Sequence, residues 1–215
     1  MSIAEKLTQI AENEQRVYDA GKKAEYDRFW DVFQNNGKRK DYLYGFAGIG
    51  WDDTTYCPKY SPITLSLNSQ YMYAYSNITD TKVPIDVSNT VAPGNCTYMF
   101  AQAQSLVTVN KLIVSNTTRW NNNFSGCRAL ESLTIEGEVA YNGLDVQHST
   151  KLNKASITSI INALSSTTSG LSVTLSKTAV NNAFGINVDD ATTYPEGSEY
   201  YALRHSKDNW TINYL

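Results

Sequence analysis

The 215-residue chain carries 18 basic and 21 acidic side chains, a net charge of −3, and only 18% charged residues. This balance excludes the basic surface by which proteins bind nucleic acids or anionic membranes. Three cysteines, Cys57, Cys96 and Cys127, are an odd number without close spacing, so we expect reduced thiols rather than a disulfide framework. The chain starts without a basic, apolar leader, which predicts cytoplasmic synthesis without a signal peptide. It also lacks the run of about 18 apolar residues needed for membrane insertion.

Residues 2 to 36 are predicted to form one helix. Ser2 is a suitable N-cap, Glu5 completes a capping box, and Gly37 ends the segment. Apolar residues from Ile3 to Ala24 recur at alternating spacings of four and three, as in a coiled coil. The helix would therefore serve attachment or homo-oligomerisation. The alternative is an amphipathic helix that packs on its own domain.

Between residues 38 and 70 the hydrophobic pattern changes to a period of two residues. Alternating residues predict short strands near positions 42–46 and 63–67, separated by a loop with Pro58 and Pro62. We interpret this segment as a β-rich N-terminal cap.

Residues 71 to 145 contain an internal repeat. The segment 71–74 (YMYA) returns as 98–101 (YMFA), and 85–90 (IDVSNT) returns as 112–117 (LIVSNT), both at an offset of 27. A third copy follows with Phe124 and Leu133. Periods of 20 to 29 residues with one short strand each are typical of leucine-rich repeats. The sequence therefore predicts a short leucine-rich-repeat-like solenoid.

Each copy would add one short strand to a parallel sheet, because a single copy cannot bury its apolar side alone. Tyr73, Phe100 and Phe124 would fill the side opposite the strands. Cys127 is interpreted as a small buried residue in a tight turn, not as a metal ligand.

Residues 146 to 215 are predicted to form an α/β C-terminal cap. A helix capped by Ser156 would carry Ile157 to Leu164. It is followed by a strand at 171–175, a helix at 177–184, a loop, a helix at 198–206 and a strand at 210–215. The predicted fold class is α+β: an N-terminal helix, the solenoid with parallel short strands, and this cap.

The stretch 124–135, FSGCRALESLTI, resembles the F-x-x-C-x-x-L-x-x-L/I-x-I/L repeat of BspA-like leucine-rich repeats. Segments 10–30, 149–164 and 209–212 are similar to the ends of proteins from prophages of gut Firmicutes. The resemblance implies a phage structural, tail-associated or surface protein without known catalysis. Its partners would be a host-surface protein or glycan, or other tail proteins. It would be virion-associated or released by lysis. The first copy departs from the pattern, since Tyr73 has no following Cys.

Candidate chemistry is sparse. The sequence contains two histidines, His148 and His205, and no metal-binding or phosphate-binding motif. Asp189 and Asp190 are interpreted as a solvated loop, and the glutamates of the third repeat as a solvent-facing rim. We expect no catalytic residues, no cofactor and no metal, hence no enzyme.

A binding function is expected instead. On the sheet, candidate contact residues lie between the inward-facing positions: Asp86, Ile113 and Thr134. Aromatic candidates are Tyr75, Trp120 and Tyr141. The favoured hypothesis is a non-enzymatic phage structural or host-recognition protein. The alternatives are a bacterial surface adhesin and, less favoured, a small glycan hydrolase.

Overall fold

The computed structural model describes residue 13 and residues 63–64, 73–76, 78–81, 84–88 and 96–215. The chain divides into two units, Met1–Arg39 and Lys40–Leu215. Asn13, which is helical, is the described residue of the first unit. The predicted N-terminal helix with its oligomerisation role therefore lies outside the described residues. So does most of the β-rich segment 38–70.

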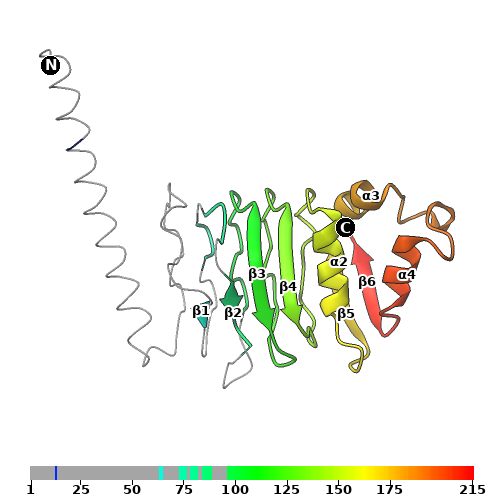
Figure 1. The fold of residues 1–215 in the computed structure, drawn as a ribbon, viewed down its shortest axis with the longest axis horizontal. Coiled ribbons are helices and arrows are strands. Elements are labelled where there is room, and N and C mark those ends of the chain that lie inside the picture. Colours follow the sequence, from blue (N-terminus) through cyan, green and yellow to red (C-terminus); the bar gives the residue numbers. More distant parts are fainter. Residues whose placement is uncertain (1–12, 14–62, 65–72, 77, 82–83, 89–95) are drawn as a thin grey trace, which may run out of the picture. The chain divides into compact units, whose positions relative to one another are not determined.

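The second unit combines helices with two small parallel sheets (Figure 1). The larger sheet contains β1 (Ile63–Thr64), β2 (Ile85–Asp86), β3 (Thr108–Val114) and β4 (Ser132–Gly137), which lie side by side in chain order. All three neighbouring pairs are parallel, and the register aligns Ile63, Ile85, Leu112 and Ile135 in one row. The described strands form no closed barrel. β1 thus belongs to the same sheet as the three repeat strands.

The apolar side chains of this row explain why this side of the sheet faces the interior. Ile85 and Leu112 are fully buried, and Ile135 is 6% exposed. β-branched and leucine side chains pack well on a pleated surface, and each buried one contributes roughly 1.5–3 kcal/mol. Where β4 ends, Gly137 has a φ of +107°, and a Cβ there would lie 2.0 Å from the Val114 carbonyl oxygen. Only glycine fits this close approach.

A series of four tight turns lies opposite the strands. In each turn, at 73–76, 100–103, 124–127 and 146–149, the fourth residue donates its N–H to the carbonyl of the first, at 3.0–3.2 Å. Backbone bonds from Tyr73 N–H to Met99 and from Phe100 N–H to Asn123 link successive turns. We call these four turns the turn series.

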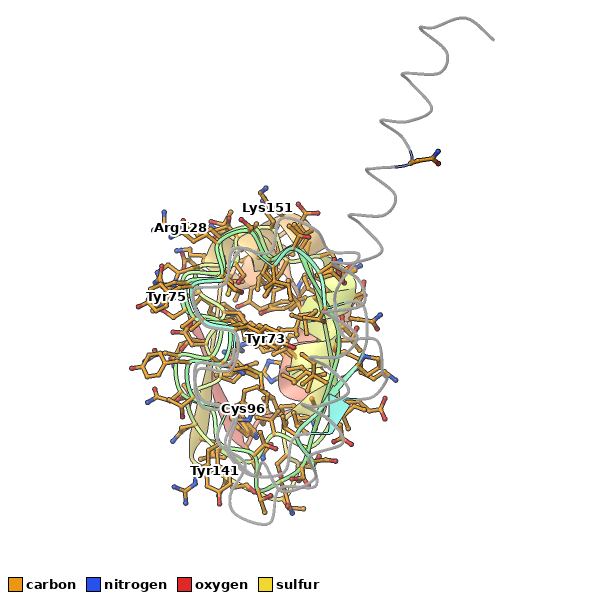
Figure 2. The ribbon with its side chains drawn as sticks, turned by 90° about the vertical axis from the view of Figure 1, so that its left-hand side faces the viewer. Tyr73, Tyr75, Cys96, Arg128, Tyr141 and Lys151 are labelled. Atoms are coloured by element: carbon orange, nitrogen blue, oxygen red, sulfur yellow. The ribbon has the colours of Figure 1, made fainter. Side chains whose placement is uncertain are left out.

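Three aromatic rings stack at the first position of the turn series. Tyr73 and Phe100 have ring centroids 5.3 Å apart, as do Phe100 and Phe124, with interplanar angles of 3° and 7°. All three side chains are buried, and Figure 2 shows Tyr73 inside the ribbon. The predicted placement of these rings in the interior is confirmed. Such pairs contribute about 0.5–1.5 kcal/mol each beyond the area they bury.

The fourth turn leads into a helix where the earlier turns lead into strands. Helix α2 (Lys154–Ala163) follows Leu152 and lies beside β4. The prediction that Ser156 caps this helix is wrong: Asn153 is the N-cap, and its side chain accepts the Ser156 N–H at 2.9 Å. The Ser156 hydroxyl instead accepts the Leu133 N–H, and the Ser159 hydroxyl accepts the Ile135 N–H, both at 2.9 Å. Helix α2 therefore ends the sheet by occupying hydrogen-bonding groups of β4.

The C-terminal region forms a second parallel sheet of two strands. β5 (Leu171–Leu175) pairs with β6 (Trp210–Tyr214), and α3 (Lys177–Phe184), the 3-10 turn η2 (Ala191–Thr193) and α4 (Glu199–His205) connect them. The predicted strands and helices of this region are confirmed. Val146 donates its N–H to Thr174, so β5 also bonds to the chain around the fourth turn.

Tyr200 forms the core of this C-terminal region. Its ring lies 4.8 Å from that of Phe184 and 5.4 Å from that of Tyr194, and its hydroxyl bonds to that of Tyr214 at 2.6 Å. Ser176 and Ser198 cap α3 and α4. These contacts attach both helices to the two-stranded sheet.

Candidate interaction surface

A second row of the register aligns Thr64, Asp86, Ile113 and Glu136. Asp86 is only 8% exposed, and its carboxylate accepts the N–H of Ser88 at 2.8 Å. Ile113 is half-buried, whereas Thr134 is exposed but does not belong to this row. The structure therefore does not bring the three predicted sheet residues into one line.

Glu136 of this row forms an ion pair with Lys111, which lies outside the row. Lys111 Nζ lies 2.6 Å from Glu136 Oε2, with both side chains more than a third exposed. An exposed pair of this kind contributes little stability, about 0–1 kcal/mol. Asp86 and this ion pair are thus bonded within the chain, whereas Asn110 and Thr134 are exposed polar residues of the same sheet.

The third position of the first three turns is different, because its backbone is left-handed. Tyr75, Gln102 and Gly126 have φ values of 57°, 59° and 80°. This conformation is ordinary for glycine and costs other residues roughly 1–2 kcal/mol. Tyr75 is nevertheless 65% exposed, and Figure 2 shows it on the outside of the ribbon. The side chain of Gln102 lies against Gly126, where a Cβ would be 2.6 Å from its Nε2.

Two further residues with left-handed backbone lie just before the second and third turns. Tyr98 and Asn122 have φ values of 56° and 49°. The Asn122 amide donates to the Tyr98 hydroxyl at 3.2 Å, so side chains from successive copies contact each other on the outside. We call the exposed side of residues 73–76, 98–104, 119–128 and 141–149 the turn face.

Tyr141 completes the aromatic positions of the turn face. It is 37% exposed, and the Arg119 guanidinium lies 5.6 Å from its ring centroid. This geometry is a cation–π contact. Trp120, by contrast, is only 4% exposed, so the prediction that it is a surface anchor is wrong. It aligns with buried Cys96, whose N–H bonds to the carbonyl of Arg119.

Cys127 has the environment of a structural thiol. It is fully buried, and its Sγ donates to the Phe100 carbonyl at 3.1 Å. Burial raises the pKa of the Cys127 thiol to about 12. The prediction that Cys127 is a small buried residue in a tight turn is confirmed by its burial and by its place in the turn 124–127. A thiol that stays protonated is a poor nucleophile.

The remaining ionisable candidates are engaged with different partners. Glu131 lies 3.8 Å from Lys151, and the Glu138 carboxylate accepts the Ser165 hydroxyl at 2.5 Å. His205 Nδ1 lies 2.9 Å from Asp208, whereas His148 Nδ1 is buried without a hydrogen-bond partner among the described residues. Within the same residues, no group of three or more His, Cys, Asp or Glu side chains is placed to hold a metal ion.

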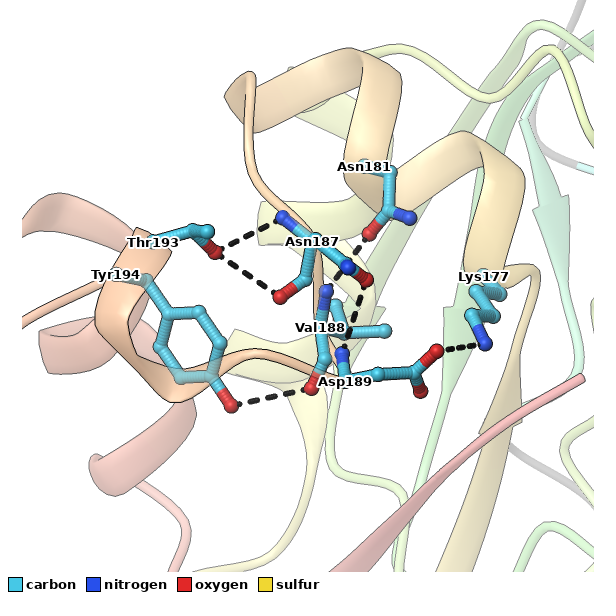
Figure 3. Close-up of polar contacts among 7 residues, drawn as sticks. All are labelled: Lys177, Asn181, Asn187, Val188, Asp189, Thr193 and Tyr194. Atoms are coloured by element: carbon cyan, nitrogen blue, oxygen red, sulfur yellow. Dashed lines mark hydrogen bonds and ion pairs between the residues drawn. The ribbon is translucent and has the colours of Figure 1, made fainter.

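The loop after α3 holds the acidic pair Asp189 and Asp190, and Figure 3 shows Asp189 beside Lys177. Asp189 forms an ion pair with Lys177 of α3. Asp190 caps η2, and hydrogen bonds from the Thr192 hydroxyl and N–H lower the pKa of its carboxyl. Both aspartates are exposed. Their contacts with Lys177 and Thr192 order the loop.

The tyrosine and amide side chains of the turn face thus form the most distinctive surface of the described chain. Within the part of the chain that the structure describes, no helix has both the length and the apolar character to span a membrane. Comparison with family models, with curated proteins and with solved structures found no match to this chain.

Proposed function

We propose that the second unit is a leucine-rich-repeat-like solenoid whose turn face recognises a ligand on a host surface, as part of a non-enzymatic, tail-associated phage protein. Three observations support the solenoid. The strands are parallel and follow chain order, the turns repeat one hydrogen-bond pattern, and the rings of Tyr73, Phe100 and Phe124 stack at 5.3 Å. Each turn with its following strand, or with α2, is one coil.

Tyr75 carries the proposal of a recognition face. Its left-handed backbone is strained by about 1–2 kcal/mol relative to glycine, and the ring is 65% exposed. Because the ring is mostly exposed, its burial stabilises the fold too little to offset the strain. Strained residues cluster at ligand-binding sites, where the side chain serves a function rather than stability.

The test is the substitution Tyr75→Gly in the full chain, with binding to host cells as the readout. We expect the free energy of unfolding not to fall, because glycine relieves the strain. We expect affinity to fall by about tenfold or more, the effect of removing an aromatic anchor.

Leu215→Ala is the matched control, since Leu215 is 69% exposed and lies outside the turn face. This variant should bind like the wild type. Equal binding by the Tyr75→Gly variant would contradict the proposal. So would Tyr75-dependent binding to purified tail proteins in place of cells, which would assign the face to particle assembly.

A further inference from the structure

We propose that the ligand of the turn face is an uncharged, extended polysaccharide that lies along the direction in which the coils stack. This inference rests on the proposed recognition function and names the chemical class of its ligand. Its support comes from the apolar content, the polar groups, the charge and the periodicity of the turn face.

The turn face lacks the apolar anchors of a protein interface. Among the described residues, the large apolar or aromatic side chains that are exposed are Tyr75, Tyr141 and Leu215, and the last lies elsewhere. Trp120 and the stacked phenylalanines are buried. Protein interfaces bury a core of aromatic, Met and aliphatic side chains. Isolated tyrosine rings with polar surroundings suit a sugar, which presents a small C–H face between hydroxyl groups.

The polar groups of the turn face are mostly uncharged amides. Gln102, Gln104, Asn121, Asn122 and Asn142 lie on or beside the turns and are exposed or half-buried. An amide side chain offers both donors and an acceptor, as each sugar hydroxyl does. The side-chain amide of Gln104 donates from Nε2 to Oε1 of the Gln102 side chain at 3.3 Å, so these neighbouring amides are oriented relative to one another.

Charge on the turn face is sparse and partly engaged. Arg119 lies against the Tyr141 ring, and the Asp145 carboxylate accepts hydrogen bonds from the Gln147 N–H and amide, both at 2.9 Å. Arg128 is exposed near the end of the third turn. Recognition of an acidic polymer requires a cluster of cations, which these residues do not form. An uncharged polymer matches the surface better.

The spacing between neighbouring coils is similar to the length of one sugar unit in an extended chain. Tyr73 N–H bonds to Met99 at 2.7 Å and Tyr98 N–H to Asn121 at 2.9 Å. Chains bonded in this way lie about 4.8 Å apart, and the interior rings repeat at 5.3 Å. One pyranose unit of an extended chain has a similar length. Each coil would therefore contact one sugar, and affinity would rise with each added sugar until the coils are spanned.

The experiment measures binding of the full chain to host cells, before and after the cell surface is treated with periodate or with protease. We expect periodate, which cleaves vicinal diols of sugars, to abolish binding, and protease or added salt to leave it unchanged. With purified neutral oligosaccharides of one to six units, affinity should increase with length, and Asn122→Ala should weaken it several-fold.

The outcomes separate the two proposals. Tyr75-dependent binding that protease abolishes and periodate spares would overturn the polysaccharide and retain recognition, with a protein ligand. Tyr75-dependent binding that is lost in about 0.5 M salt, where charge interactions are screened, would indicate an acidic ligand and also overturn it. Absence of any Tyr75-dependent binding to cells would reject both proposals.

Discussion

The contact between α2 and β4 allows a quantitative prediction. The hydroxyl groups of Ser156 and Ser159 accept the N–H groups of Leu133 and Ile135 at 2.9 Å. Leu133 is 0% exposed and Ile135 is 6% exposed, so water cannot readily replace either hydroxyl. A buried donor left without an acceptor costs about 1–3 kcal/mol. Alanine has the higher helix propensity and offsets this by up to about 0.5 kcal/mol.

We therefore expect Ser156→Ala and Ser159→Ala each to lower the free energy of unfolding by about 1–2 kcal/mol. The double variant should lose about 2–4 kcal/mol, since each serine serves a different donor. Urea denaturation followed by circular dichroism measures these differences. Asn162→Ala, on an exposed position of α2, is the control and should change stability by less than about 0.5 kcal/mol. The reasoning is refuted if both serine variants are as stable as this control.

Four further predictions concern stability and thiol reactivity. Phe100→Ala should lower the free energy of unfolding by about 3–5 kcal/mol, because Phe100 is the middle ring of the stack; denaturation with intact cooperativity and unchanged midpoint would contradict this. Asn123→Met should raise the thermal midpoint, because the buried Asn123 amide has no hydrogen-bond partner among the described residues. Gly137→Ala should destabilise by at least about 1–3 kcal/mol, as a Cβ meets the Val114 carbonyl; wild-type stability would show that the strand end can shift. Cys127 should resist iodoacetamide at pH 8 until the chain unfolds, since its pKa is about 12; mass spectrometry of the native protein reads this directly.

Much of the C-terminal half could be predicted from sequence because local patterns decide it. The strand and helix signals between 171 and 214 are short and unambiguous, and Ser176, Gly185 and Ser198 stand at the helix ends. The alignment of Tyr73, Phe100 and Phe124 was also predictable, because aromatic residues recur at the offsets of the repeat.

The fourth copy could not be found by matching residue types. Val146 takes the place of the aromatic residue, and Ser149 that of the cysteine. The structure shows why serine can take the place of cysteine in the fourth turn. Cys127 Sγ donates to the Phe100 carbonyl, and Ser149 Oγ donates to the Cys127 carbonyl at 3.0 Å. In these two turns the fourth position holds a small side chain that donates a hydrogen bond to the preceding turn, whereas Ala103 at the same position of the second turn is small but has no side-chain donor. A search for residue identity does not detect this shared property.

The surface residues were harder to predict than the interior. Alternation along a strand places side chains on two sides of a sheet, and it holds around Trp120, which is buried between exposed Arg119 and Asn121. The aromatic character of Trp120 did not indicate which of the two sides it occupies. The left-handed backbone of Tyr75 is set by the turn that surrounds it. The residues next to Tyr75 in the sequence give no indication that its backbone is left-handed, a conformation that favours glycine.

The backbone hydrogen bonds between neighbouring turns point along the axis of the stack, and this orientation has a mechanical consequence. In the proposed tail-associated solenoid, tension between a particle-bound end and a ligand-bound turn would load these bonds one row at a time rather than all together. The first coils would peel away in sequence while the C-terminal region, closed by β5 and β6, held longest. Such stepwise extension dissipates energy and would keep an attached particle tethered under flow.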